Sequence, residues 1–166
     1  MAPRYLVWGA RGWVAEHLLS HLASTGASAV GTTVRMEDRE AVLAELERVK
    51  PTHVLNAAGC TGRPNVDWCE DHQAETVRSN VIGTLNLADC CLLKEVHCTV
   101  FATGCLYQYD EAHPVGGKGY TEEDEPTFKG SFYSLTKGLV EPVSAFFIWA
   151  SCLSIYSHER SGERVC

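Results

Sequence analysis

Two side chains near the end of the chain have the types and the spacing of a proton-transfer pair. Tyr133 and Lys137 are four residues apart, so on a helix they share one face. A tyrosine hydroxyl has an ordinary pKa of about 10, and a neighbouring ammonium favours its ionised form. Such a hydroxyl can exchange a proton with a carbonyl or an alkoxide while a hydride moves. The same lysine can hold the ribose beside a nicotinamide, so the pair predicts hydride-transfer chemistry.

Two further reactive side chains follow a short apolar run. Thr103 stands at the tip of a predicted strand and can hydrogen-bond a substrate oxygen. Cys105 comes two residues later, where a thiol can act as acid or base at a carbon next to a ketone. On spacing alone, a buried cysteine without a chemical role is the simpler interpretation of Cys105. A Tyr-x-x-x-Lys pair alone often occurs by chance. With Thr103 one strand earlier, a chance occurrence becomes rare.

A glycine-rich turn follows the first apolar run and opens a helical pattern. Gly9 permits a tight turn, and Gly12 lets the backbone approach a pyrophosphate at the positive end of a helix. A strand, a turn and a helix in this order are the context that such a motif requires. We therefore favour nucleotide binding over a purely structural turn. The predicted contact residues are Gly9, Ala10, Arg11, Gly12 and Trp13.

The second predicted strand bears on the choice between NADP and NAD. It ends without an acidic residue at its tip, where a carboxylate would hold the ribose 2′-hydroxyl of NAD. Arg11 and Arg35 are candidates to meet a 2′-phosphate, which favours NADP. A solvated surface charge is a nearly equally good interpretation of Arg35. The small residues Asn56, Ala57, Ala58 and Gly59 end the third strand and leave room for an adenosine, or simply form a strand-ending turn.

Alternating apolar strands and helices must position these side chains. The pattern predicts strands over residues 5–8, 27–34, 52–57 and 98–102 and helices over residues 13–23, 39–50, 73–95 and 132–140. Asp38 and Ser131 are expected N-caps. Loops occupy residues 60–70 and 107–130. The order predicts an α/β fold with a Rossmann-type, doubly wound parallel sheet, in which ligands bind at the carboxyl ends of the strands.

The composition excludes several classes of protein. The chain has 166 residues, of which 14 are basic and 21 acidic, and a formal charge of −7 argues against nucleic-acid binding. Its eight cysteines form no C-x-x-C motif, so we expect free thiols, no metal site and a cytoplasmic location. No signal peptide is expected. The longest apolar stretch, of about 14 residues from Val143, is shorter than a membrane span.

Long strings of residues resemble a known family. They run over residues 51–59, 61–70, 101–105 and 130–137, and they are similar to the extended branch of the short-chain dehydrogenases/reductases. Within it they resemble the plant and algal nucleotide-rhamnose synthases, which are bifunctional 3,5-epimerase/4-reductases acting on UDP-4-keto-6-deoxy-glucose. The bacterial dTDP-4-dehydrorhamnose reductases are more distant relatives of these enzymes.

The resemblance implies roles for individual residues. Gly9, Arg11 and Gly12 would bind NADP(H) or NAD(H), with residues 56–59 along the adenosine. Thr103, Tyr133 and Lys137 would be the reductase triad, and Cys105 an epimerase acid or base. Asn65, Val66 and Asp67 would face a UDP- or dTDP-4-keto-6-deoxy sugar, and Asn80 would be a structural asparagine.

The resemblance stops at about Glu141. We expect a cofactor-binding Rossmann domain over residues 1–141 and a divergent tail over residues 142–166. Pro142 should interrupt the last helix, and the strand that follows in the family should be missing. The sheet would then be incomplete, without the C-terminal substrate lobe, and the second epimerase group would be absent.

Three interpretations stay open for such a chain. The first is an NADP(H)-dependent epimerase/reductase in rhamnose formation. The second is a non-catalytic NAD(P)-binding module or regulatory subunit, and the third is a non-functional fragment with an exposed sheet edge. Neither a membrane nor a nucleic acid is an expected partner. A homodimer is one option for its assembly.

Overall fold

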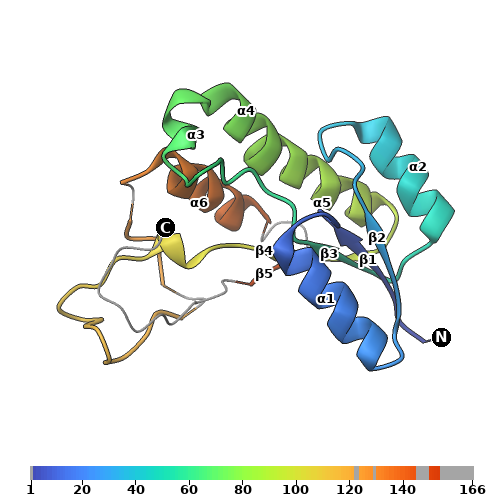
Figure 1. Ribbon diagram of the computed structural model, residues 1–166, viewed down its shortest axis with the longest axis horizontal. Coiled ribbons are helices and arrows are strands. Elements are labelled where there is room, and N and C mark those ends of the chain that lie inside the picture. Colours follow the sequence, from blue (N-terminus) through green and yellow to red (C-terminus); the bar gives the residue numbers. More distant parts are fainter. Residues whose placement is uncertain (1, 122–123, 129, 145–149, 154–166) are drawn as a thin grey trace.

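Five parallel strands form the central sheet of the protein, in the order β2-β1-β3-β4-β5 (Figure 1). The structure is a computed structural model that describes residues 2–121, 124–128, 130–144 and 150–153. The strands are β1 (Arg4–Trp8), β2 (Ser28–Thr32), β3 (His53–Asn56), β4 (His97–Phe101) and β5 (Ala150–Leu153). The predicted Rossmann-type parallel sheet is confirmed, and each of the first four strands lies within two residues or so of its predicted bounds.

Helices cover both faces of this sheet. Helix α1 (Trp13–Ser24) lies on one face, while α2 (Arg39–Val49), α4 (Gln73–Val77) and α5 (Thr84–Leu93) lie on the other (Figure 1). Asp38 caps α2 as predicted, because its Oδ1 accepts a hydrogen bond from the Ala41 backbone at 3.0 Å. The chain crosses over the sheet in opposite directions before and after β2, which puts α1 and α2 on opposite faces.

The predicted helix over residues 73–95 contains a π-helical segment. This segment, η1 (Arg78–Gly83), joins α4 to α5 without a break, because Val77, Arg78, Gly83 and Thr84 all have right-handed helical dihedral angles. A π-helical segment inserts extra backbone into a helix and often occurs at functional sites. Here it carries Asn80, which is buried.

The core lies between the sheet and the helices on the side of α2 and α5. β1, β3 and β4 contribute apolar side chains to it, and α2 and α5 cover them. Trp8 is fully buried, and its indole N–H donates to the Val34 carbonyl at 2.7 Å. Its other members include Leu6, Val42, Leu46, Val54, Leu87, Cys90, Cys91, Cys98 and Val100.

The expected break at Pro142 and the expected loss of the next strand were wrong. Helix α6 (Phe132–Ser144) contains Pro142, and β5 pairs with β4 in parallel from Cys98↔Ala150 to Phe101↔Leu153. A proline removes one helical hydrogen bond, and the buried face of α6 offsets that loss through tertiary packing. The free edge of β4 likewise supplies hydrogen bonds to a segment whose own pattern is weak. The rest of the predicted tail, residues 145–149 and 154–166, lies outside the described residues.

Candidate active site

The glycine turn after β1 brings two strand ends together. Gly9 has a φ of +81°, and a Cβ built there would lie 2.8 Å from the Cα of Ala58. Only glycine therefore permits this turn to approach the turn that follows β3. Gly12 donates its N–H to the Gly9 carbonyl at 2.8 Å and forms the N-cap of α1 without a side-chain hydrogen bond. The first turn of α1 thus has backbone N–H groups that no side chain caps.

A cavity of about 290 Å³ opens at this turn, at the carboxyl ends of β1, β2 and β3. We call it the turn pocket. It brings together most of the residues predicted to bind the cofactor. These are Gly9, Arg11, Gly12, Arg35, Ala57, Ala58 and Gly59.

Besides Tyr133 and Lys137 on α6, three residues predicted to bind the cofactor do not line the turn pocket. Ala10 donates its N–H to the Thr32 carbonyl at 3.0 Å, and Trp13 is 72% exposed and lies against the His17 ring. Asn56 is buried, and its Oδ1 accepts from the Ala58 N–H at 3.0 Å. Asn56 therefore holds the turn after β3 through this hydrogen bond and does not itself reach the pocket.

A charged pair at the β2 side of the turn pocket was missed by the sequence analysis. Glu37 Oε1 accepts from Nε and NH2 of Arg35 at 3.0 and 2.7 Å. Arg35 is 73% exposed, whereas Glu37 is 21% exposed. Glu37 lies just beyond the strand tip, the only position at which the sequence pattern was expected to show an acid. Other residues missed at this pocket are Thr33, Val34, Met36 and Ser79.

The predicted pair lies on the buried face of α6. Tyr133 and Lys137 are 6% and 8% exposed. Ser131 is the expected cap, because its Oγ accepts from the Ser134 N–H at 3.1 Å. A Cβ built on Gly59 would lie 3.2 Å from the Lys137 Nζ, so the ammonium lies against the wall of the turn pocket.

A second cavity, of about 320 Å³, lies beside Tyr133. We call it the thiol pocket. Its walls come from the loop after β3, the turn after β4 and helix α6. The predicted residues Asn65, Val66, Thr103, Cys105 and Tyr133 line it, together with Thr61, Gly62 and Pro64, which the sequence analysis did not single out.

One predicted substrate residue does not line the thiol pocket. Asp67 instead folds the loop back on itself. Its N–H donates to Asn65 Oδ1, and its Oδ2 accepts from Asn65 Nδ2, both at 3.1 Å. Asp67 therefore positions the side chain of Asn65, which does line the pocket.

Asn80 connects the wall of the thiol pocket to the helix that bears the tyrosine. Its Oδ1 accepts from the Cys60 N–H at 2.7 Å, and its Nδ2 donates to the Cys60 carbonyl at 2.9 Å. The same Nδ2 lies 3.3 Å from the Thr136 hydroxyl on α6. The structural role expected for this buried asparagine therefore has a geometric basis in η1.

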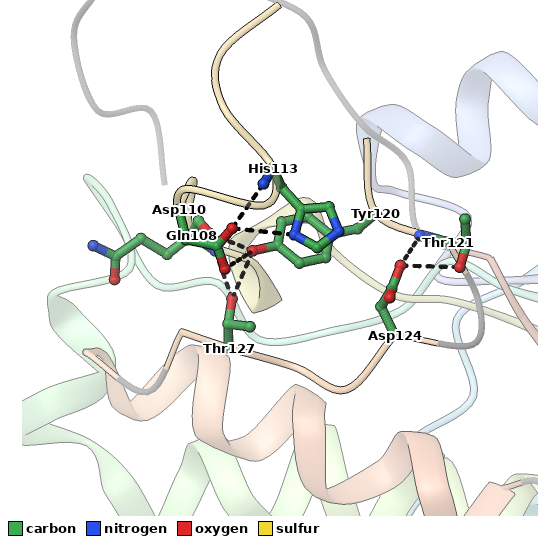
Figure 2. A network of polar contacts seen from close by, with 7 residues as sticks. All are labelled: Gln108, Asp110, His113, Tyr120, Thr121, Asp124 and Thr127. Carbon is green, nitrogen blue, oxygen red and sulfur yellow. Dashed lines mark hydrogen bonds and ion pairs between the residues drawn. The ribbon is translucent and has the colours of Figure 1, made fainter. Parts of the chain in front are cut away.

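The segment between the Cys105 turn and α6 is held by a polar network (Figure 2). The Tyr120 hydroxyl donates to the Gln108 carbonyl at 2.5 Å, and its ring stacks on the rings of Tyr107 and His113. Two carboxylates clamp the turns on either side of it. These are Asp110, which accepts from the His113 N–H at 2.8 Å, and Asp124, which accepts from the Thr121 N–H at 2.6 Å.

Two features are absent from the described part of the chain. No group of three or more His, Cys, Asp or Glu side chains there has the arrangement to hold a metal ion. None of its helices is long and apolar enough to cross a membrane. The site is thus built from a glycine turn, a buried Tyr–Lys pair, a threonine and a thiol.

Comparison with known proteins gives relatives with named activities. The bifunctional dTDP-4-dehydrorhamnose 3,5-epimerase/dTDP-4-dehydrorhamnose reductase of Arabidopsis thaliana is 50% identical over 138 residues, which are 82% of this chain and 46% of that protein. The crystal structure of the UDP-rhamnose synthase from Acanthamoeba polyphaga mimivirus is 31% identical, with a TM-score of 0.81. It covers 93% of this chain and 55% of that one. The chain thus spans about half the length of these relatives.

A third comparison shows the fold alone. The dTDP-4-dehydrorhamnose reductase of Bacillus anthracis, solved in complex with NADP, is 18% identical with a TM-score of 0.75, over 93% of this chain and 53% of that one. A family model matches residues 5–144, which are most of the 166 residues of the chain. On this match, the chain belongs to the NAD dependent epimerase/dehydratase family.

Proposed function

We propose that the chain binds NADP(H) and takes part in 3,5-epimerisation and 4-reduction of a nucleotide 4-keto-6-deoxy sugar in rhamnose formation. One observation carries the proposal. Thr103, Cys105 and Tyr133 line one pocket, and Lys137, one helical turn from Tyr133, lies against the other. The reacting groups of a reductase and of an epimerase are thus adjacent to a pocket that suits a dinucleotide.

The turn pocket fits a dinucleotide on three counts. The uncapped N–H groups of α1 and the Arg11 guanidinium suit a pyrophosphate. The small residues Ala57, Ala58 and Gly59 leave room beside the turn. Residues 33–37, at the end of β2, are where a Rossmann fold receives the adenosine ribose.

Different residues of the chain would then have different roles in the reaction. A bound nicotinamide supplies the hydride that reduces C4. Tyr133 donates the proton to the C4 oxygen, Thr103 hydrogen-bonds that oxygen, and Lys137 holds the nicotinamide ribose. Cys105 is one of the two acid/base groups that inversion at C3 and C5 requires, and it exchanges a proton on one face of these carbons, whose protons are acidic because they lie next to the C4 ketone.

Arg11 and Arg35 support NADP(H) over NAD(H). Both guanidinium groups line the turn pocket, and both suit a 2′-phosphate. The Arg35 side chain is 73% exposed, so it can leave Glu37 for a ligand at small cost.

The six described cysteines are free thiols, which supports the reducing cytoplasm as the location.

A binding module without catalysis is the second candidate. The observation that favours it is that the turn pocket is lined by the glycine turn and the ends of β2 and β3, without Thr103, Cys105 or Tyr133. A pocket of this kind can hold a dinucleotide whether or not a reaction follows.

Two measurements on the purified chain separate these candidates. Fluorescence titration with NADPH tests binding, and addition of UDP- or dTDP-4-keto-6-deoxy-glucose tests turnover. The enzyme proposal expects NADPH oxidation in the wild type and a loss of at least about 100-fold in the Tyr133→Phe variant. Binding of NADPH without its oxidation would favour the non-catalytic binding module. Equal rates of NADPH oxidation in the wild type and in Tyr133→Phe would refute the proposed mechanism.

A further inference from the structure

Two thiols stand at the two ends of the loop that forms one wall of the thiol pocket. Cys60 follows the turn after β3, and Cys69 lies in the short helix α3 (Trp68–Asp71). Between them, Thr61, Gly62, Pro64, Asn65 and Val66 line the pocket. A covalent bond between the two thiols would therefore close this wall into a ring.

The Cys69 thiol lies against Cys60 in the folded chain. The Cys69 Sγ lies 3.9 Å from the Cys60 carbonyl oxygen. Burial raises the pKa of the Cys69 thiol, the Thr76 hydroxyl opposes this, and the Cys60 thiol raises the pKa further. The side chain of Asn80 holds both the N–H and the carbonyl of Cys60, which limits how far this cysteine can move away.

The two thiols differ in access, as a reactive pair requires. Cys60 is half-buried, whereas Cys69 is fully buried. Cys60 can therefore meet a small molecule from solution, and Cys69 can meet only Cys60 and its packing neighbours. Those neighbours include Tyr133 and Cys105, which pack in the same cluster.

We propose that Cys60 and Cys69 form a reversible disulfide by exchange with a low-molecular-weight disulfide such as oxidised glutathione. The Cys60 thiolate attacks one sulfur of the small disulfide, and one thiol leaves as a mixed disulfide forms. Cys69 then attacks Sγ of Cys60 and expels the second thiol. Two protein thiols are oxidised, and one small disulfide is reduced to two thiols.

The chain contains a matched internal control. Cys91 and Cys98 also interact through their thiols, and this interaction together with burial raises the pKa of Cys91. Both are essentially fully buried, with exposed fractions of 0% and 1%. Proximity alone would oxidise this pair as well, whereas the proposed exchange needs an accessible thiol and leaves it reduced.

The bond would also act on the proposed active site. Drawing the Cys69 sulfur towards Cys60 removes it from its packing with Tyr133 and Cys105. This consequence rests on the proposed function, since it requires that the thiol pocket receives the sugar. We then expect oxidation to lower keto-sugar reduction and a dithiol reductant to restore it.

Peptide mapping of the intact chain tests the bond itself. The reduced chain is incubated with oxidised glutathione, alkylated, digested and analysed by mass spectrometry. We expect the loss of two alkylatable thiols and one cross-linked peptide pair joining Cys60 to Cys69. The Cys60→Ser variant should retain the other thiols in alkylatable form, and Cys105→Ser should form the bond as the wild type does.

Each other outcome overturns the proposal. A stable glutathione adduct on Cys60, a Cys69–Cys105 bond, an oxidised Cys91–Cys98 pair, or no reaction would each do so. A parallel incubation in urea checks that the pairing requires the fold, because an unfolded chain should lose its preference for this pair. If the bond forms but neither redox state reduces the keto sugar, the proposed function fails while the thiol pair stands.

Discussion

Single backbone and side-chain positions decide what each pocket can hold. Gly9 and Gly12 keep the floor of the turn pocket free of side chains, and Arg11, Arg35 and Glu37 place charge around it. In the thiol pocket a hydroxyl, a thiol and a phenol stand within one cavity. The first set suits an anionic ligand with a ribose, and the second suits proton exchange around a ketone.

Replacement of Gly9 by alanine tests the contact between the two turns. A new Cβ would lie 2.8 Å from backbone atoms of Ala58, in addition to the strain of a φ of +81°. We expect a loss of about 2–4 kcal/mol in the free energy of unfolding, measured with urea, and loss of NADPH binding.

Gly26→Ala is the matched control for this variant. Gly26 has a similar φ of +73°, but nothing lies within 4 Å of a Cβ built there. It should therefore report the backbone strain alone, at about 1 kcal/mol. Equal losses in the two variants would show that the close approach to Ala58 is unimportant.

The Arg35–Glu37 pair predicts how the cofactor preference responds to mutation. A 2′-phosphate must draw Arg35 away from Glu37, whose carboxylate also repels the phosphate. Glu37→Gln should therefore tighten NADPH binding about tenfold, and Arg35→Ala should weaken it by a similar factor. Both variants should change the affinity for NADH much less.

Fluorescence titration of both dinucleotides against each variant measures this preference. Arg4→Ala serves as a control that removes an arginine outside the turn pocket. An unchanged ratio of the NADPH and NADH dissociation constants in Glu37→Gln would show that the pair does not face the 2′ position.

Whole elements position these residues by meeting at one edge of the sheet. The π-helical segment η1 directs Asn80 into the loop after β3, and α6 presents Tyr133 and Lys137 to the two pockets. The described residues between the Cys105 turn and α6 are held by their polar network (Figure 2), and the Ser134 hydroxyl on α6 donates directly to the Cys105 carbonyl at 2.8 Å.

This network should loosen in acid. A hydrogen bond from the His113 backbone lowers the pKa of Asp110, and one from the Thr121 backbone lowers the pKa of Asp124. Carboxylates with a lowered pKa stabilise the fold above their ordinary value of about 4, and this contribution is lost as the pH falls below it. We expect faster amide hydrogen exchange over residues 107–128 below about pH 4, after correction for the intrinsic rate.

Asp110→Asn combined with Asp124→Asn should remove most of this pH dependence. Exchange in α1 provides the internal reference, because that helix lies elsewhere on the sheet. If the double variant kept the full acid response, the two carboxylates would not be its cause.

At the scale of the whole molecule, β5 is the element that changes the description of the chain most. It covers one edge of β4, so the sheet in the described residues has five strands rather than four. An uncovered parallel edge presents unpaired N–H and carbonyl groups, which favour association between chains. The segment after α6 therefore protects β4, and the four-residue β5 becomes the edge strand of the described sheet.

Two truncations test this protection. A chain that ends after residue 144 lacks β5 and should elute as larger species in size-exclusion chromatography as its concentration rises. A chain that ends after residue 153 keeps β5 and should elute like the full chain at both concentrations. Identical profiles for the two truncations would show that β5 does not cover the edge in solution.

Local patterns were sufficient for the elements that carry strong signals. The buried strand residues, the Asp38 cap and the spacing of Tyr133 and Lys137 each depend on neighbours in the sequence, so they could be predicted from it. The strand at residues 150–153 could not, since its pairing energy comes from β4, about 50 residues away in the chain.

The sequence by itself determined the Rossmann sheet, the glycine turn and the family, because periodicity and motif strings are local properties. Only the tertiary structure decided which residues share a pocket. It placed Glu37 beside Arg35, turned Trp13, Ala10 and Asp67 away from the cavities, and brought Cys60 to Cys69. These outcomes depend on side-chain directions and on contacts between distant elements, which no single segment encodes.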